Sequence, residues 1–262
     1  MSVCLVIPHT PWIPARVKSM QRLRDQLGKW DGPYLELTER ASNKQWPRKM
    51  WQWALDSGAD TFCTLQDDTL IAPCFWPALR AMLPSVGEHA VLGLSAVHPI
   101  GVEIQRQGLR WYRTQSWLVG WAYAMRRPAL AGFVAWYDDN PELVARHNED
   151  DLINEWVRAS GRTTWHPVPT LVDHDTSIES TYANDSHVHR RASVTWRDYG
   201  EGSLTDPDFW LPSGEPPLLP VPAPHECWFC LKRPGHAASS TSGARICRLC
   251  VAQVASALIG GG

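Results

Sequence analysis

Two adjacent carboxylates, Asp67 and Asp68, directly follow the short apolar and β-branched run Thr61–Leu65. That run predicts a buried strand, and residues 73–75 predict the start of a helix. In open α/β sheets ligands bind at the carboxyl ends of strands, so both acids stand where chemistry is expected. Neighbouring carboxylates repel each other unless a cation or a positive group lies between them, and a hard divalent ion carrying phosphate oxygens suits that position. The alternative is that one acid only caps the next helix.

A second acidic group, Glu149, Asp150 and Asp151, lies just before a stretch with helical spacing. The helix dipole and capping favour acids at such a position, but it also suits a general base that faces a substrate. Further along the chain, His174 directly follows a predicted strand. A neutral imidazole can complete a metal site that already has one carboxylate, so Asp68 and His174 are predicted to share a dication.

Strands alternate with helices along the sequence as far as about residue 200. This order predicts an α/β fold, with a mainly parallel sheet covered by helices on both faces. The polar, irregular stretch 104–115 is expected to be a mobile loop. Strands are predicted at 2–7, 34–38, 61–65, 90–97, 117–125 and 163–172, and helices at 15–27, 45–55, 75–82, 128–136 and 151–159.

Two Cys-x-x-Cys pairs, separated by sixteen residues, lie near the C-terminal end of the sequence. Four thiolates at this spacing form a tetrahedral site for a structural Zn²⁺ ion. A segment this short cannot bury enough core alone, so metal binding would supply its folding energy. The predicted domains are therefore 1–200, a proline-rich linker at 201–226 and a zinc-binding module at 227–262. The zinc ligands are Cys227, Cys230, Cys247 and Cys250.

Composition narrows the class of protein. The chain has 262 residues, 44% of them hydrophobic, and a formal net charge of −2, which argues against a protein built mainly to coat nucleic acid. Neither a secretory signal nor an apolar run of membrane-spanning length is present, so we expect a cytoplasmic protein without membrane contact. In that compartment the seven cysteines are thiols or metal ligands. Cys4, Cys63 and Cys74 are expected to be buried thiols.

Several motifs together resemble the GT-A fold glycosyltransferases. They are 65–68 (Leu-Gln-Asp-Asp), the predicted strand 117–125 with Arg127-Pro128 after it, the pair Asp150-Asp151, and 168–174 (Val-Pro-Thr-Leu-Val-Asp-His). More narrowly, the chain is similar to small glycosyltransferase-like proteins common in bacteriophages and actinobacteria. The resemblance covers about residues 2–199. It implies a GT-A-like, Rossmann-like sheet that is mixed but mainly parallel.

The resemblance also implies roles for individual residues. Asp68 would hold Mn²⁺ or Mg²⁺ on the diphosphate of a nucleotide-sugar donor, with Asp67 beside it and His174 as a further ligand. Asp150 or Asp151 would face the acceptor hydroxyl. The chain departs from the usual Asp-x-Asp motif because an amide, Gln66, stands at the first position, which leaves hydrogen bonding as its role. Contacts to the nucleotide are further expected from Thr10, Arg16 and Arg40, which lie near the ends of the first two strands.

The cysteine-rich end resembles the four-cysteine zinc-binding domain at the N-terminus of the ClpX unfoldase. In that family the module dimerises and binds substrates or adaptors. Here it is C-terminal, and the sequence has no Gly-x-x-x-x-Gly-Lys-Ser/Thr loop, so the resemblance implies docking or dimerisation rather than unfolding. An apolar helical stripe is expected to form the homodimer seam. Its members are Val251, Val254, Leu258 and Ile259.

Two functional hypotheses follow. The first is a metal-dependent glycosyltransferase with a zinc tail, cytoplasmic in its host if phage-encoded. Its acceptor would be a phage DNA base, a virion protein or a glycan, and a base would have to be flipped from the stack or modified as a free nucleotide. The alternative is a non-catalytic adaptor on a GT-A scaffold that recruits a protein or nucleic acid through the tail. Arginines that could meet a phosphate backbone are Arg110, Arg113, Arg126, Arg127, Arg190 and Arg191.

Overall fold

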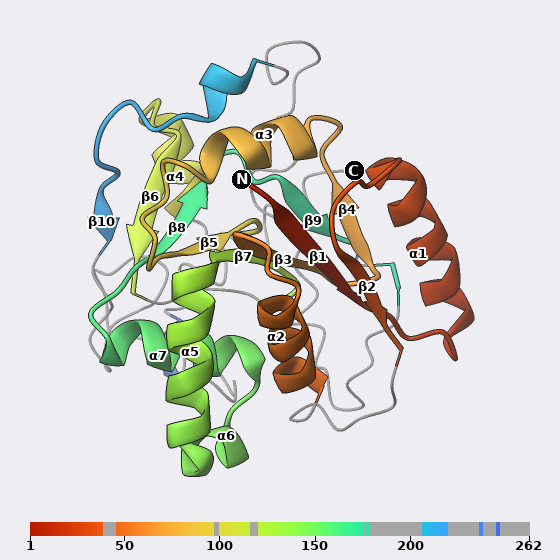
Figure 1. Cartoon of the computed structure of the whole chain (residues 1–262). Helices are drawn as coiled ribbons and strands as arrows, with labels where there is room; N and C mark the ends of the chain where they lie inside the picture. Colours follow the sequence, from red (N-terminus) through yellow and green to blue (C-terminus); the bar gives the residue numbers. More distant parts are fainter. Residues whose placement is uncertain are drawn as a thin grey trace.

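The chain folds as an α/β protein around one eight-stranded sheet (Figure 1). Four neighbouring strand pairs are parallel and three are antiparallel, so the sheet is mixed but mainly parallel, as predicted. The strand order is β10-β6-β8-β5-β7-β3-β1-β2. The strands are β1 (Val3–Pro8), β2 (Tyr34–Leu37), β3 (Thr61–Leu65), β5 (Val91–Gly93), β6 (Trp111–Thr114), β7 (Ala122–Arg126), β8 (Thr164–Pro167) and β10 (Leu218–Leu219).

The computed structural model describes residues 1–38, 46–96, 100–115, 120–175, 177–178 and 206–219, together with the backbone of 236–237 and 245–246. Over these ranges, every helix is too short or too polar to span a lipid bilayer. The four predicted zinc ligands, the predicted dimer stripe and Arg40 lie outside the described residues.

Helices cover both faces of the sheet, and the alternation of side chains along β1 shows why. Leu5 and Ile7 point into the core under α1 (Pro14–Leu27) and α3 (Phe75–Met82). Cys4 and Val6 point into the opposite core. A strand with apolar residues on both faces must be covered on both. The second core lies under α2 (Trp46–Asp56), α5 (Arg127–Asp139) and α7 (Glu149–Ala159), the helices on that side of the sheet in Figure 1.

The sequence of α1 explains where this helix begins and where it ends. Pro14 lies in the first turn of α1, where a missing N–H costs nothing. Gly28 ends the helix with a φ of 63°, a backbone conformation that suits glycine. Met20, Leu23 and Leu27 face the sheet, and this stripe orients the whole helix. As a result the first turn of α1 lies beside the carboxyl end of β1.

A short antiparallel ribbon, not expected from the sequence, brings two distant segments together. It joins β4 (Thr69–Ile71) to β9 (Val172–His174), with Thr69 opposite His174. The Asp175 N–H also donates to the Asp68 carbonyl at 2.9 Å. The predicted strand 163–172 is in fact divided, because β8 ends at Pro167 and β9 begins five residues later in a separate sheet.

The prediction of a mobile loop at 104–115 was wrong. This stretch contains the end of α4 (Ile100–Arg106) and the whole of β6. Trp111 and Tyr112 are both buried, although they are adjacent, because β6 has the sheet core on one side and a small cluster with Ile104 on the other. A helix not expected from the sequence, α6 (Pro141–Arg146), separates α5 from α7.

Part of the proline-rich segment 201–226 is built into the sheet domain. Its residues Pro207–Trp210 form a 3-10 helix, and β10 pairs in parallel with β6 at the sheet edge. Trp210 is 2% exposed within the core under α3. Further along, β11 (His236–Ala237) and β12 (Arg245–Ile246) form an antiparallel pair between the two predicted Cys-x-x-Cys motifs. The proposed division into three domains stays a prediction.

Candidate functional site

Asp67 is fully buried at the carboxyl end of β3, and both of its oxygens are engaged. Its Oδ2 accepts the Thr10 N–H at 2.7 Å and lies 3.0 Å from His9 Nδ1. Its Oδ1 accepts a hydrogen bond from Arg16. These three partners belong to the segment from the end of β1 to the first turn of α1. Asp67 therefore fixes that segment to the end of β3.

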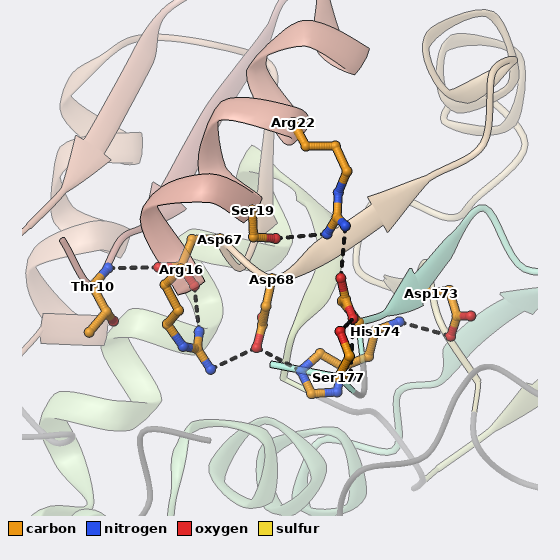
Figure 2. Close-up of polar contacts among 10 residues, drawn as sticks. Thr10, Arg16, Ser19, Arg22, Asp67, Asp68, Asp173, His174 and Ser177 are labelled. Carbon is orange, nitrogen blue, oxygen red and sulfur yellow. Dashed lines mark hydrogen bonds and ion pairs between the residues drawn. The ribbon is translucent and has the colours of Figure 1, made fainter. Parts of the chain in front are cut away.

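Asp68 is equally buried but less completely bonded. Its Oδ2 lies 2.8 Å from His174 Nε2 and 2.7 Å from Arg16 Nη2 (Figure 2). Its Oδ1 is buried and has no hydrogen-bond partner among the described residues. The side chains of Asp68 and His174, 106 positions apart in sequence, thus lie at one site. This juxtaposition is the one on which the sequence-based hypothesis depended.

The positive group between the two carboxylates is the guanidinium of Arg16, which is only 5% exposed. One of its amino groups contacts Asp67 and the other contacts Asp68 (Figure 2). Burial alone would raise the pKa of Asp68, but the hydrogen bond from His174 and the positive charge of Arg16 outweigh burial and hold that pKa below its ordinary value. Asp68 is therefore charged at neutral pH in spite of its burial.

Several contacts fix the ring of His174. The Trp121 ring stacks on it, with centroids 4.7 Å apart and an interplanar angle of 14°. The Asp173 carboxylate accepts the backbone N–H of His174 at 2.8 Å. The next residue, Asp175, is held by Arg22 of α1 at 2.7 Å. His174 Nδ1 is buried without a partner in the described part of the chain. The imidazole is thus oriented before any ligand binds.

The described residues contain no group of three or more His, Cys, Asp or Glu side chains that could hold a metal ion. Asp68 and His174 nevertheless offer two ligands, and the orphaned Oδ1 of Asp68 is a buried acceptor that a cation would satisfy. Mg²⁺ is commonly held by one or two carboxylates together with substrate phosphates and water. The donor set therefore fits a dication that arrives with phosphate oxygens.

Glu149 is committed to the core. It is 8% exposed and accepts a hydrogen bond from the Tyr123 hydroxyl, which in turn accepts the indole N–H of Trp51 at 3.0 Å. Burial raises the pKa of Glu149 to about 8, so its carboxyl is mostly protonated at neutral pH. Glu149 is thus a poor candidate for the base.

Asp150 lies at the same edge of the sheet as Asp68. It packs on Gly120, where an added Cβ would lie 3.4 Å from the Asp150 Cβ. The next residue, Trp121, is the one that stacks on His174. Burial and, to a smaller extent, the charge of Asp151 raise the pKa of Asp150 to about 6. A half-buried carboxylate with this pKa is suited to general-base work near neutral pH.

The other predicted site residues divide into three groups. Thr10 contributes a backbone N–H, and Gln66 donates its backbone N–H to the Trp121 carbonyl at 2.8 Å, so both organise the site. Arg16 contacts the carboxylates of Asp67 and Asp68, and its expected contact with a nucleotide stays a prediction. Arg40 and the four zinc cysteines are not among the residues that the structure describes. Two residues of the site, His9 and Trp121, were not predicted from the sequence. Their positions next to the ends of strands were the only features that could have indicated them.

Comparison with protein-family models and with curated protein sequences gives no match. Among solved structures, "Crystal Structure of A197 from STIV" aligns over 66% of this chain and 85% of that one, with 13% identity and a TM-score of 0.41. The mannose-1-phosphate geranyltransferase from Thermus thermophilus aligns over 66% of this chain and 76% of its own, with 13% identity and a TM-score of 0.42. Likeness of this degree carries no conclusion about activity, which must come from the residues of this chain.

Proposed function

We propose that this chain is a glycosyltransferase that moves a sugar from a nucleotide-sugar donor to an acceptor hydroxyl. The observation that carries the proposal is the 2.8 Å contact between Asp68, at the carboxyl end of β3, and His174, at the end of β9. Two distant segments are folded onto each other to bring a carboxylate and an imidazole together. Asp150 packs on Gly120, the residue before the Trp121 whose ring stacks on His174.

The residues divide the chemistry between them. Asp68 and His174 would hold Mn²⁺ or Mg²⁺, which supplies Lewis-acid stabilisation of the diphosphate leaving group. Arg16, which contacts Asp68, would supply a second positive charge beside the diphosphate. Asp150 accepts the proton of the acceptor hydroxyl as its oxygen bonds to the sugar carbon and the bond from that carbon to the diphosphate breaks. Trp121 keeps the imidazole of His174 in place.

The acceptor stays open between a DNA base, a virion protein and a glycan. Arg110 and Arg113, which the sequence offered as contacts for a phosphate backbone, instead hold residues 206–219. Arg126 forms an ion pair with Glu88 at 3.4 Å. These arginines therefore give little support to a nucleic-acid acceptor. The four-cysteine tail is proposed to bind Zn²⁺ and to dock a partner or a second copy of the chain.

A non-catalytic adaptor is the second candidate, and one observation favours it. Both oxygens of Asp67 are bonded, and Arg16 offsets one of the two negative charges of the carboxylate pair. A buried charge network of this kind can have a purely structural role, in which it specifies the fold and takes no part in catalysis. In such a protein the tail would recruit the partner and the sheet domain would have no turnover.

The substitution Asp68→Asn separates the two candidates, because the amide has the volume of the acid but not its charge. Hydrolysis of a panel of nucleotide-sugars in the presence of Mn²⁺ is measured for both forms, and transferred sugar is sought by mass spectrometry. We expect Asp68→Asn to lose about 100-fold or more in kcat. Asp138→Asn is the matched control, since Asp138 is half exposed on α5 and pairs with Arg48.

Two outcomes would favour the adaptor instead. One is the absence of nucleotide-sugar binding and of turnover in the wild type. The other is a slow hydrolysis that is equal with and without Mn²⁺ and unchanged by Asp68→Asn.

A further inference from the structure

The guanidinium of Arg16 occupies the place where a dication would be needed. Its Nη2 lies 2.7 Å from Asp68 Oδ2, the same oxygen that contacts His174 Nε2. Its Nη1 contacts Asp67 Oδ1. A cation bound to Asp68 and His174 would therefore lie close to a buried positive charge. Figure 2 shows the contacts of Arg16 and His174 meeting at Asp68.

This placement sets up a competition. A dication and a guanidinium that lie about 4 Å apart at a partly buried site repel each other strongly, because the dication carries two charges and water screens them only in part. A bare dication would have to overcome this repulsion and also take Oδ2 from Arg16. When the dication binds together with a phosphate, the negative charge of the phosphate reduces this repulsion. The phosphate oxygens also accept hydrogen bonds from the guanidinium amino group that has left Asp68.

Arg16 is well built for such an exchange. A guanidinium has two amino groups in a rigid fork, which suits paired oxygens of carboxylate or phosphate. The Asp67 that holds one of them is itself fixed by the Thr10 N–H at 2.7 Å and by His9 at 3.0 Å. The contact to Asp67 can thus persist while the contact to Asp68 is given up. The Oδ1 atom of Asp68, which is buried and has no hydrogen-bond partner among the described residues, is available to bind such a ligand.

We propose that Arg16 is a specificity-determining residue that lets Asp68 and His174 accept a divalent cation only together with a phosphate group. This inference rests on the proposed function in so far as the ligand is a metal–diphosphate complex. It adds that the metal and the diphosphate bind with strong positive coupling, and that Arg16 is the origin of the coupling. By linkage each ligand then raises the affinity for the other by the same factor.

The coupling is measured by equilibrium dialysis of the full chain against Mn²⁺, with and without inorganic pyrophosphate, with both free concentrations determined. For the wild type we expect pyrophosphate to raise the Mn²⁺ affinity by about tenfold or more. The informative variant is the double substitution Asp67→Asn/Arg16→Gln, which removes one negative and one positive charge together. It should bind bare Mn²⁺ about tenfold tighter than the wild type and lose most of the pyrophosphate effect. A merely structural role would weaken binding, so the gain is diagnostic.

Two further variants complete the experiment. Asp68→Asn reports the Mn²⁺ held elsewhere on the chain, including the cysteine-rich tail, and this background is subtracted. Arg16→Lys keeps the charge and so protects the fold, but a single ammonium cannot bridge both acids in the same fork geometry. It should show a coupling between those of the wild type and the double variant. Near-ultraviolet circular dichroism checks that each variant is folded.

The inference is overturned if removing Arg16 leaves the affinity for bare Mn²⁺ unchanged or weaker, or if no Mn²⁺ binding depends on Asp68. It is also overturned if Arg16→Lys, when folded, couples the two ligands as strongly as the wild type. Failure of sugar transfer is a separate result. Coupled binding of Mn²⁺ and pyrophosphate without any transfer would refute the glycosyltransferase and leave the role of Arg16 intact.

Discussion

At the scale of single residues, burial separates three consecutive acids. Glu149 faces the core and bonds to Tyr123, so its raised pKa of about 8 keeps it protonated at neutral pH. Asp150 is half buried beside Gly120 and has a pKa of about 6. The sequence left the choice among these acids open, because all three fit a helix N-terminus equally well. The raised pKa of Glu149 disfavours that residue, and the half-buried position of Asp150 supports our proposal that Asp150 is the base.

The pKa of Asp150 predicts the pH dependence of the proposed reaction. A base must be deprotonated to act, so kcat/KM should rise with pH through about 6 and level off above it. Asp150→Asn should remove this limb and lower the rate by about 10²- to 10⁴-fold. Both effects are measured with saturating Mn²⁺ and a defined acceptor across pH 5 to about 8.

The neighbours of Asp150 serve as matched controls. Asp151 raises the pKa of Asp150 through its charge, so Asp151→Asn should shift the limb to lower pH. Glu149→Gln should leave the limb in place, since an amide oxygen can still accept the hydrogen bond from Tyr123. A limb that stays unchanged in Asp150→Asn would mean that another group takes the proton.

At the scale of elements, two short segments pack against the main sheet domain: the ribbon of β4 and β9, and residues 206–219. The ribbon of β4 and β9 places His174 against Asp68. Residues 206–219 cover the outer edge of the sheet, where the indole N–H of Trp111 donates to the Trp210 carbonyl at 3.1 Å. Arg113 donates through Nε to the Pro216 carbonyl at 2.9 Å. The sheet domain therefore depends on a segment that its proline content alone would assign to a linker.

This dependence predicts a large effect of Trp210→Ala on stability. Trp210 is 2% exposed, and truncating a buried tryptophan to alanine costs about 3–5 kcal/mol in the free energy of unfolding. The adjacent Leu211 is 39% exposed, so Leu211→Ala should change stability by only about 0.5 kcal/mol. Urea unfolding followed by tryptophan fluorescence, with circular dichroism as a second probe, measures both. Equal small effects would show that 206–219 adds nothing to the stability of the domain.

At the scale of the whole molecule, the cysteines divide into two sets. Cys4, Cys63 and Cys74 are buried free thiols of the sheet domain, and burial raises the pKa of each. The other four of the seven form the predicted Zn²⁺ site. A thiol reagent reacts with the thiolate, so buried and protonated thiols react slowly.

Removal of the metal should therefore expose one set only. The purified chain is expected to contain one Zn²⁺ by mass spectrometry, and chelation should release it and make four thiols reactive while three stay protected until the domain unfolds. Cys227→Ser/Cys247→Ser should abolish the bound Zn²⁺, whereas Cys74→Ser should not change it. Seven equally reactive thiols in the folded protein, or Zn²⁺ that survives the double substitution, would refute the assignment.

By itself, the sequence determined the α/β class, most of the helices and about half of the strands that the structure describes, and the position of Asp67 and Asp68 at a strand end, because each of these follows from local periodicity and local breakers. Tertiary structure decided the rest. The strands β4 and β9 have three residues each, too few to show an alternation, so the sequence did not predict the ribbon that holds His174 against Asp68, although it placed both residues at one site. Likewise, only the packing of α1 against the sheet places the Arg16 guanidinium between two carboxylates more than 50 residues away. The sequence gives the charge of a side chain, but which group that side chain contacts depends on how the helices and strands pack in the folded protein.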